Sequence, residues 1–583
     1  MDRAAPWGMA GLLLYVMAAA AAGWRYFPGF SGDHAWYLQV ALRVSRGDVL
    51  YRDVAWAYGP LPAQVLAALF RWGGPDAAWA SLVNVLLTLA GVLLTYVVIR
   101  GLLAPGPALL VTAFATLAGA NPWYSLFHAQ YYVYTQAIAW GGVASLAALA
   151  AALRWEKTGR SVWLFAAGVA SGLATLSKPE FGLAALATCS AALLVGRSTV
   201  GGWWRYLSAF ATTVIVGFGL QVFSAGFWPV WRGYSGYDQV LGEAGQLWGT
   251  RLGDRRLLLG GHAFWLAVGA LWASRRWPRR RRWFLGLAVA GVMVMVGVGL
   301  TYLFGMTSAS VVDMVQRRDL SGITAAPANL LFLVSLPWVL LLPMVLGAGW
   351  LARGRGLPPA WWIMWAYVVA SSLRHLLTGY ANPFVVGPAL AVFGVWFEDR
   401  LSRSPHKPRR RCRFAWAALA GMAIMNLSAQ VLIPNFLLNG PRVWIDTALG
   451  PVGIARPYEA EYRAAIAFID QNVPADAPVF STGWGADWYL LTQRPNPTVF
   501  DVVFTGIGTR GSDADAIEHD LATSPPAALI VPKVWLVNAD DSPRDPSEMR
   551  HNLPQWWQSL QHEYSDKTPI EIKHWRVLLR GPN

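Results

Sequence analysis

Charged residues are scarce in this sequence. Asp, Glu, Lys and Arg make up 14% of the 583 residues, whereas about 25% is usual in a soluble globular protein. Apolar residues make up 55% of the chain, which also contains 33 Trp and 20 Tyr. This composition excludes an ordinary soluble protein and predicts an integral membrane protein with aromatic side chains at both bilayer interfaces.

Cysteine is also nearly absent. The two cysteines are Cys189, inside an apolar segment, and Cys412, inside a basic segment. Because these segments would lie at different depths of a membrane, we expect no structural disulfide between the two residues. A Cys-rich metal site is excluded, and the sequence shows no repeat with a period of roughly 20 to 50 residues that would indicate a solenoid.

Long apolar segments dominate the first three quarters of the chain. A membrane-spanning helix needs about 20 apolar residues, and about 13 segments qualify. The first follows Arg3 and is interpreted as a span rather than a cleaved signal, because an aromatic-rich loop and further spans come after it. The predicted spans lie near residues 8–26, 80–99, 102–120, 134–153, 161–177, 180–196, 204–225, 257–274, 283–304, 328–351, 360–379, 383–397 and 414–433.

Basic residues predict the orientation of these spans. The formal net charge is +15, and Lys and Arg gather in short loops between spans, above all at 275–283 and 398–413. Under the positive-inside rule such loops are cytoplasmic, so nucleic acid is not an expected partner. Alternation of the spans then predicts a multi-pass protein of the inner (plasma) membrane with a cytoplasmic N-terminus. Residues 27–79 and everything after 433 are expected on the outer side.

The composition changes after residue 433, where Asp, Glu and Pro become common. We therefore predict a transmembrane domain over 1–433 and a soluble extracytoplasmic α/β domain over 434–583. The segment "EYRAAIAFIDQNVP" predicts a helix that Pro474 ends. Further predicted elements are strands at 477–481, 527–532 and 570–580, with helices near 485–493, 513–522 and 554–564.

Two short helices are predicted between the first and second spans, within residues 33–71. In the first, Trp36 and its apolar neighbours share one face, with Arg43 and Arg46 turned away. The second begins at Pro60 and Pro62, where the missing N–H groups cost least. Both fit helices that lie in the outer interface, half in lipid and half in water.

Asp33 opens the first of these helices, where the first span would emerge from the membrane. An acidic residue there has two interpretations that can coexist. It is a functional carboxylate at the membrane border, or it is the N-cap of the helix that follows.

Several motifs, taken in order, carry a resemblance to a known superfamily. They are Asp33 after the first span, the "YRD" and "YGPLP" runs of residues 51–62, "LATLSKPEFG" at 173–182, "RHLLTGYANPFVVGPAL" at 374–390, and the C-terminal stretches "AIAFIDQNVPADAPVFS" and "WYLLTQRPNP". The chain thereby resembles, over nearly its whole length, the GT-C superfamily of membrane glycosyltransferases. Two departures stand out: Asp33-His34 replaces the Asp-Glu pair of many members, and Gly59-Pro60 replaces the Lys-Pro pair of aminoarabinose transferases.

The resemblance implies a polytopic α-helical, GT-C-like fold and a specific activity. A sugar would pass, with inversion, from a polyprenyl-phosphate donor to a glycan, lipid or protein acceptor on the outer face of the membrane. Asp33 is the candidate catalytic base, since a carboxylate within reach of the acceptor hydroxyl can take its proton. Candidate substrate-binding residues are His34, Tyr58, His128, Gln130, Tyr131, Lys178, Glu180, Arg374, His375 and Tyr380.

The sequence requires no cofactor. A divalent metal ion is compatible with the chemistry, but the outer loops show no compact His/Asp cluster, and Asp33 with His34 would supply at most two ligands.

Other interpretations of these residues stay open. Arg374 and Lys178 at span ends are also typical of cations that snorkel to the interface, and the tyrosines near residue 131 are typical of belt anchors. A multi-span transporter or lipid-linked-sugar flippase is the alternative function, although the near-absence of charge within the spans favours chemistry at one face. A third possibility is a scaffold in which Asp33 is dispensable.

Overall fold

The structure is a computed structural model. It describes residues 5–27, 32–118, 136–196, 200–235, 358–378, 388–389, 391–392, 442–454, 456–483, 485–503, 511–532, 564, 570–572 and 575–580. Several predicted elements lie wholly or mostly outside these residues: the spans at 257–274, 283–304, 328–351, 383–397 and 414–433, the helix near 554–564 and the boundary at residue 433.

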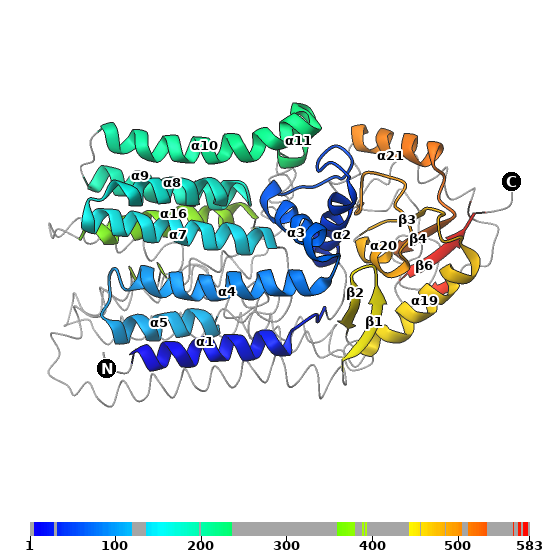
Figure 1. Cartoon of the computed structure of the whole chain (residues 1–583), viewed down its shortest axis with the longest axis horizontal. Coiled ribbons are helices and arrows are strands. Elements are labelled where there is room, and N and C mark those ends of the chain that lie inside the picture. Colours follow the sequence, from blue (N-terminus) through cyan, green and yellow to red (C-terminus); the bar gives the residue numbers. More distant parts are fainter. Residues whose placement is uncertain are drawn as a thin grey trace, which may run out of the picture.

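A bundle of roughly parallel helices forms one end of the molecule (Figure 1). Three of the described helices, α4, α7 and α10, are long and apolar enough to cross a membrane, and shorter apolar helices pack beside them. The chain is therefore a helical membrane protein. The bundle comprises α1 (Ala5–Ala22), α4 (Ala77–Ile99), α5 (Pro105–Ala118), α7 (Gln136–Thr158), α8 (Ser161–Thr175), α9 (Pro179–Val195), α10 (Val200–Ala225) and α16 (Pro359–Thr378).

Small residues let these helices approach closely. At Gly168 of α8, an added Cβ would fall 2.5 Å from the carbonyl oxygen of Tyr206 in α10. At Gly172, one turn later, it would fall 2.6 Å from Thr213 of the same helix. Glycines at helical spacing are typical of helix contacts inside a membrane. They fix the position of α8, which leads into the hairpin described below.

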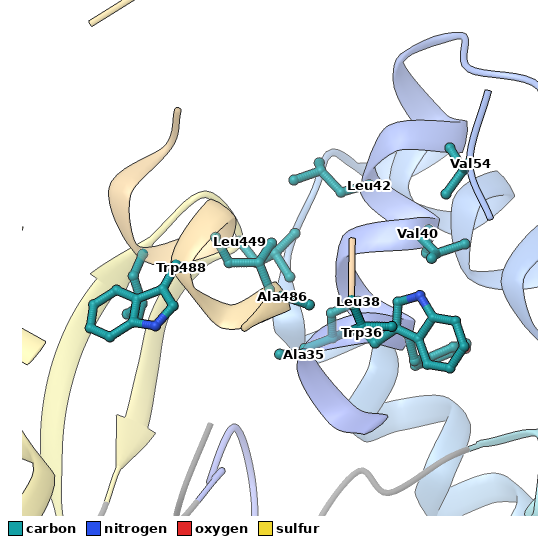
Figure 2. Close-up of a cluster of buried hydrophobic side chains, with 14 of the residues drawn as sticks. Ala35, Trp36, Leu38, Val40, Leu42, Val54, Leu449, Ala486 and Trp488 are labelled. Carbon is teal, nitrogen blue, oxygen red and sulfur yellow. The ribbon is translucent and has the colours of Figure 1, made fainter. Parts of the chain in front are cut away.

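Two short helices, α2 (Asp33–Arg46) and α3 (Pro60–Gly73), lie across the end of the bundle (Figure 1). Their bounds agree with the sequence prediction, but the expected environment of α2 is wrong. Its residues from Ala35 to Leu42 are all buried, so this part of the helix has no face for lipid or water, and only its last turn, with Arg46, is exposed. The reason is a second packing partner: α20 (Ala486–Thr492) covers the side of α2 that α3 does not contact (Figure 2).

The described residues from 442 onward, here called the C-terminal unit, alternate strands and helices. A four-stranded sheet has the order β3-β4-β6-β5, with β3 parallel to β4 and the other pairs antiparallel. A separate antiparallel hairpin, β1–β2, precedes it. The elements are β1 (Val443–Thr447), β2 (Gly450–Ile454), α19 (Glu459–Asn472), β3 (Val479–Ser481), α20, α21 (Gly511–Thr523), β4 (Ala528–Pro532), β5 (Ile570–Ile572) and β6 (Trp575–Leu579).

One expectation for this unit is wrong. The sequence predicts a single strand over 570–580, whereas β5 and β6 form a hairpin in which Ile570 pairs with Val577. A long strand and a tight hairpin both show a period of two residues, so the pattern alone does not separate them.

The C-terminal unit docks directly on the ends of the membrane helices. The N–H of Ala77, which opens α4, donates to the carbonyl oxygen of Leu449 at 3.0 Å. Gly453 of β2 exchanges two backbone hydrogen bonds of 2.8 Å with Arg25 and Phe27, just after α1. One hydrophobic core, which includes Trp36 and Trp488, continues from α2 into the sheet (Figure 2). The unit is thus packed against the bundle and is not a separate tail.

Candidate active site at the end of the helix bundle

A buried lysine lies in the tight turn between α8 and α9. Lys178 is the N-cap of α9, which begins at Pro179, and its side chain is only 8% exposed. Its Nζ is 3.3 Å from Oε1 of Glu180, in the first turn of the same helix. A buried charge is tolerated when a partner of opposite sign lies beside it. The "SKPE" motif therefore forms a compact, partly shielded ion pair at the end of two helices of the bundle.

The α2–α3 loop (residues 47–59) rests on this hairpin. The N–H of Gly59 donates to the carbonyl oxygen of Ser177 at 3.0 Å, and the N–H of Leu61 donates to that of Leu176 at 3.1 Å. Nζ of Lys178 lies 4.8 Å from the ring centroid of Tyr58, which is cation–π distance. Two motifs that are more than 100 positions apart in the sequence thus form one site.

Gly59 is required at this contact. An added Cβ would fall 2.0 Å from the carbonyl oxygen of Leu176 and 2.9 Å from the backbone nitrogen of Ser177. Only a residue without a side chain lets the two backbones approach this closely.

Asp33 occupies the first turn of α2. The N-cap of α2 is Gly32, and Asp33 is the first residue of the helix. The N-cap interpretation of Asp33 is therefore wrong. A carboxylate in the first turn still interacts favourably with the positive end of the helix. One turn later, the ring of Trp36 lies 5.8 Å from that of Tyr58. Trp36 of α2 and Lys178 of the hairpin therefore both contact Tyr58. Half-buried His34 follows Asp33 in the same turn.

Packing among aromatic side chains stiffens the loop that joins these groups. The rings of Trp36 and Trp56 lie 5.0 Å apart in a T-shaped contact, as do those of Trp56 and Tyr58. Trp56 is buried, and its indole N–H donates to the carbonyl oxygen of Gly59 at 3.0 Å. Such contacts each stabilise a structure by about 0.5–1.5 kcal/mol beyond area burial. Contacts with Trp36 and Trp56 thus fix the position of Tyr58 over Lys178.

Sequence reasoning missed two residues beside the site. Gln136, at the start of α7, accepts from the hydroxyl of Tyr37 at 2.6 Å and donates to the carbonyl oxygen of Ala80 at 2.9 Å, so it joins α2, α4 and α7. Tyr234 lies in α11 (Phe227–Ser235), within a segment expected to be a loop, and donates to the carbonyl oxygen of Thr175 at 2.8 Å. A polar glutamine near the start of the predicted span 134–153 is the sequence signal that would have pointed to Gln136.

The remaining predicted site residues lie outside the part of the chain with described side chains. His128, Gln130, Tyr131 and Tyr380 lie outside the described residues, and Arg374 and His375 belong to the end of α16 without described side chains. Within the residues that were searched, no group of three or more His, Cys, Asp or Glu is placed to hold a metal ion.

Comparison with known proteins gives a distant likeness. No family model and no curated protein matches the chain. Several solved structures do match the chain. One is ArnT from Cupriavidus metallidurans bound to undecaprenyl phosphate, at 15% identity over 99% of this chain and 98% of that one, with a TM-score of 0.40. Another is the oligosaccharyltransferase AglB from Archaeoglobus fulgidus with an inhibitory peptide and dolichol-phosphate, at 13% identity over 90% of this chain and 69% of that one, with a TM-score of 0.42.

The structural neighbours are GT-C enzymes. The apo form of the Archaeoglobus enzyme matches at 13% identity over 91% of this chain and 70% of that one, with a TM-score of 0.46. This is the superfamily that the sequence motifs resemble. Because identity and TM-scores are low, the chain's own residues have to support any function.

Proposed function

We propose that this protein is an inverting glycosyltransferase that moves a sugar from a polyprenyl-phosphate donor to an acceptor at the face of the membrane covered by α2 and α3. The observation that carries the proposal is the docking of residues 58–61 on the 176–180 hairpin. Through Tyr58 and Trp36 it links the buried Lys178–Glu180 pair to α2, whose first residue is Asp33, and this link supports the proposal.

Charge distribution supports the outer side for this face. The α7–α8 connection, with Arg154, Lys157 and Arg160, lies at the end of α7 opposite to Gln136, which contacts α2. Lys and Arg are enriched in cytoplasmic loops. The end of the bundle that carries Asp33 and Lys178 is therefore the extracytoplasmic one.

Lys178 suits the departing phosphate. The donor is a lipid whose phosphate would lie at the membrane boundary, the level of the α8–α9 hairpin. As the bond between the anomeric carbon and the phosphate oxygen breaks, negative charge grows on that oxygen, and a preorganised cation stabilises it. Lysine does so as a compact point charge. Glu180 and the Tyr58 ring hold the ammonium group in place.

Asp33 suits the acceptor. Its carboxylate would take the proton of the acceptor hydroxyl while that oxygen forms a bond to the anomeric carbon on the face opposite to the leaving phosphate. The products are the glycosylated acceptor, with inverted configuration, and polyprenyl phosphate. General-base catalysis of this kind is typically worth about 10²–10⁴-fold in rate. The acceptor is a hydroxyl of a glycan, a lipid or a protein.

The experiment is a turnover assay on the purified full-length protein in nanodiscs. A panel of undecaprenyl- and dolichyl-phosphate sugars is offered with mixed acceptors, and release of the polyprenyl phosphate is measured. We expect turnover by the wild type and a loss of about 100-fold or more in kcat/KM for Lys178→Met, as for loss of one stabilising donor.

Lys157→Met is the matched control, because Lys157 is exposed at the other end of α7. It should keep wild-type turnover. Full activity of Lys178→Met would refute the assigned role of the lysine, and no turnover by the wild type with any donor would refute the function.

A further inference from the structure

Arg43 joins α2 to the C-terminal unit. The sequence predicts that this arginine is turned away from the apolar face of an interfacial helix, but its side chain is only 16% exposed. Its Nη1 donates to Oδ1 of Asp501 at 3.1 Å and to the carbonyl oxygen of Thr498 at 3.0 Å. Asp501 is fully buried and lies 458 positions further along the chain. An arginine with this fork of donors is a rigid connection.

The same guanidinium also holds the α2–α3 loop. Its Nε donates to Oδ2 of Asp48 at 2.7 Å, and its Nη2 donates to the carbonyl oxygen of Asp53 at 2.7 Å. Two residues later, the N–H of Ala55 donates to the carbonyl oxygen of Val499 at 2.8 Å. The loop is therefore attached to residues 498–501 through both a side chain and its backbone.

The far end of the loop reaches the proposed phosphate site. Gly59 is bonded to Ser177, and Tyr58 lies over Lys178. Contacts thus lead from Asp501 through Arg43 to the α2–α3 loop, and from Tyr58 and Gly59 of the same loop to the hairpin that carries Lys178. The contacts at the two ends of the loop are hydrogen bonds and a cation–π contact, and the backbone of the loop joins them.

We propose that Arg43 is a positioning residue through which the C-terminal unit holds the α2–α3 loop, and with it Tyr58, against Lys178. The C-terminal unit is then part of the donor-binding site, and its role there is to keep the phosphate-binding cation in place. The identity of the ligand, a polyprenyl phosphate, rests on the proposed function; the mechanical connection does not.

The geometry predicts that loss of Arg43 changes KM for the donor more than kcat. Arg43 is about 15 Å along α2 from Asp33, since ten residues of helix rise by that amount, so the base keeps its environment. Loss of the connection instead lets Tyr58 move relative to Lys178. A displacement of about 1 Å in a catalytic arrangement can cost on the order of 100-fold. We expect undecaprenyl phosphate to bind about tenfold or more weakly, with KM for the donor rising more than kcat falls.

Four variants of the full-length protein test this: Arg43→Gln, Arg43→Lys, Asp501→Asn and the double variant Arg43→Gln/Asp501→Asn. Arg43→Lys keeps the charge but lacks the planar fork, so it should remain defective. The double variant should be no worse than the more impaired single variant, because both remove the same connection. Arg46→Gln is the matched control, since Arg46 is an exposed arginine in the same helix.

Two readouts are compared in nanodiscs. The first is the affinity for undecaprenyl phosphate, with kcat and KM wherever a donor is turned over. The second is amide hydrogen exchange in peptides that cover residues 49–61 and 174–180. We expect weaker binding together with faster exchange in both peptides for the four variants, and no change for Arg46→Gln.

The two proposals fail separately. If the wild type turns over no lipid-linked sugar, the proposed function fails, and hydrogen exchange still decides the role of Arg43. If Arg43→Gln and Asp501→Asn leave exchange in 174–180 at the wild-type level, the positioning role is refuted whatever the activity. If Arg43→Gln fails to fold, hydrogen exchange of Asp501→Asn alone tests the positioning role, because this substitution keeps the shape of the side chain.

Discussion

Replacement of Gly59 by alanine is the substitution for which the structure gives the clearest magnitude. The new Cβ would lie 2.0 Å from the carbonyl oxygen of Leu176 and 2.3 Å from its carbonyl carbon. Both atoms are backbone, so the clash cannot be relieved by a side-chain rotation, and the loop has to move away from the hairpin by about 1 Å. The φ of Gly59 is −63°, which alanine adopts readily, so backbone strain is not the cause.

This displacement would break two backbone hydrogen bonds, Gly59 to Ser177 and Leu61 to Leu176. Each contributes about 1 kcal/mol, and overpacking costs about 1–3 kcal/mol more. We therefore expect Gly59→Ala to lower the free energy of unfolding by about 2–5 kcal/mol. The displacement also separates Tyr58 from Lys178, so turnover should fall on the order of 100-fold.

The assay is thermal unfolding in detergent, followed by tryptophan fluorescence, with turnover measured below the transition. Gly219→Ala is the control, because an added Cβ there meets no atom within 4 Å and alanine stabilises a helix by about 0.5–1 kcal/mol relative to glycine. Wild-type melting and wild-type turnover for Gly59→Ala would refute the docking of the loop on the hairpin, and with it the arrangement of the site.

Three further outcomes are expected. Gln136→Leu removes the acceptor of the Tyr37 hydroxyl and the donor to Ala80, so the free energy of unfolding should fall by about 1–3 kcal/mol; unchanged chemical denaturation would contradict this. Burial raises the pKa of Asp487 well above its usual value, so the folded state binds a proton more tightly and stability falls as pH rises from about 4 through the folded pKa. Asp487→Asn should therefore gain in melting temperature over the wild type at pH 8 more than at pH 5, and an equal difference at both values would contradict the raised pKa. Sealed vesicles should show no concentrative uptake of lipid-linked sugars, and uptake would favour the transporter alternative.

Periodicity and helix-stop signals predicted most of the described helices. The bounds of α2 and α3 follow from Asp33, Gly47, Pro60 and Gly74, which are local signals that tertiary packing did not override. The Lys178 hairpin follows from the two apolar spans at 161–177 and 180–196, which leave only a short turn between them. The contact between the "YGP" and "SKPE" motifs was not predicted, since no local rule specifies a contact across more than 100 residues.

The environment of α2 was not predictable from its own residues. An amphipathic helix looks the same whether its polar positions face water or a second protein layer. Arg43 shows the difference: from the sequence it is a solvated charge, and in the structure it binds the buried Asp501. Only the position of the C-terminal unit decides between the two, and that position depends on contacts such as Ala77 with Leu449.

The central claim is that the carboxylate of Asp33 takes the proton of the acceptor. The most direct measurement compares kcat/KM of Asp33→Asn with that of the wild type at saturating acceptor, with Asp446→Asn, an exposed carboxylate in β1, as the control. We predict that Asp33→Asn loses about 10²–10⁴-fold, keeps its affinity for undecaprenyl phosphate, and that Asp446→Asn is unchanged. Turnover by Asp33→Asn within a few-fold of the wild type would contradict the account.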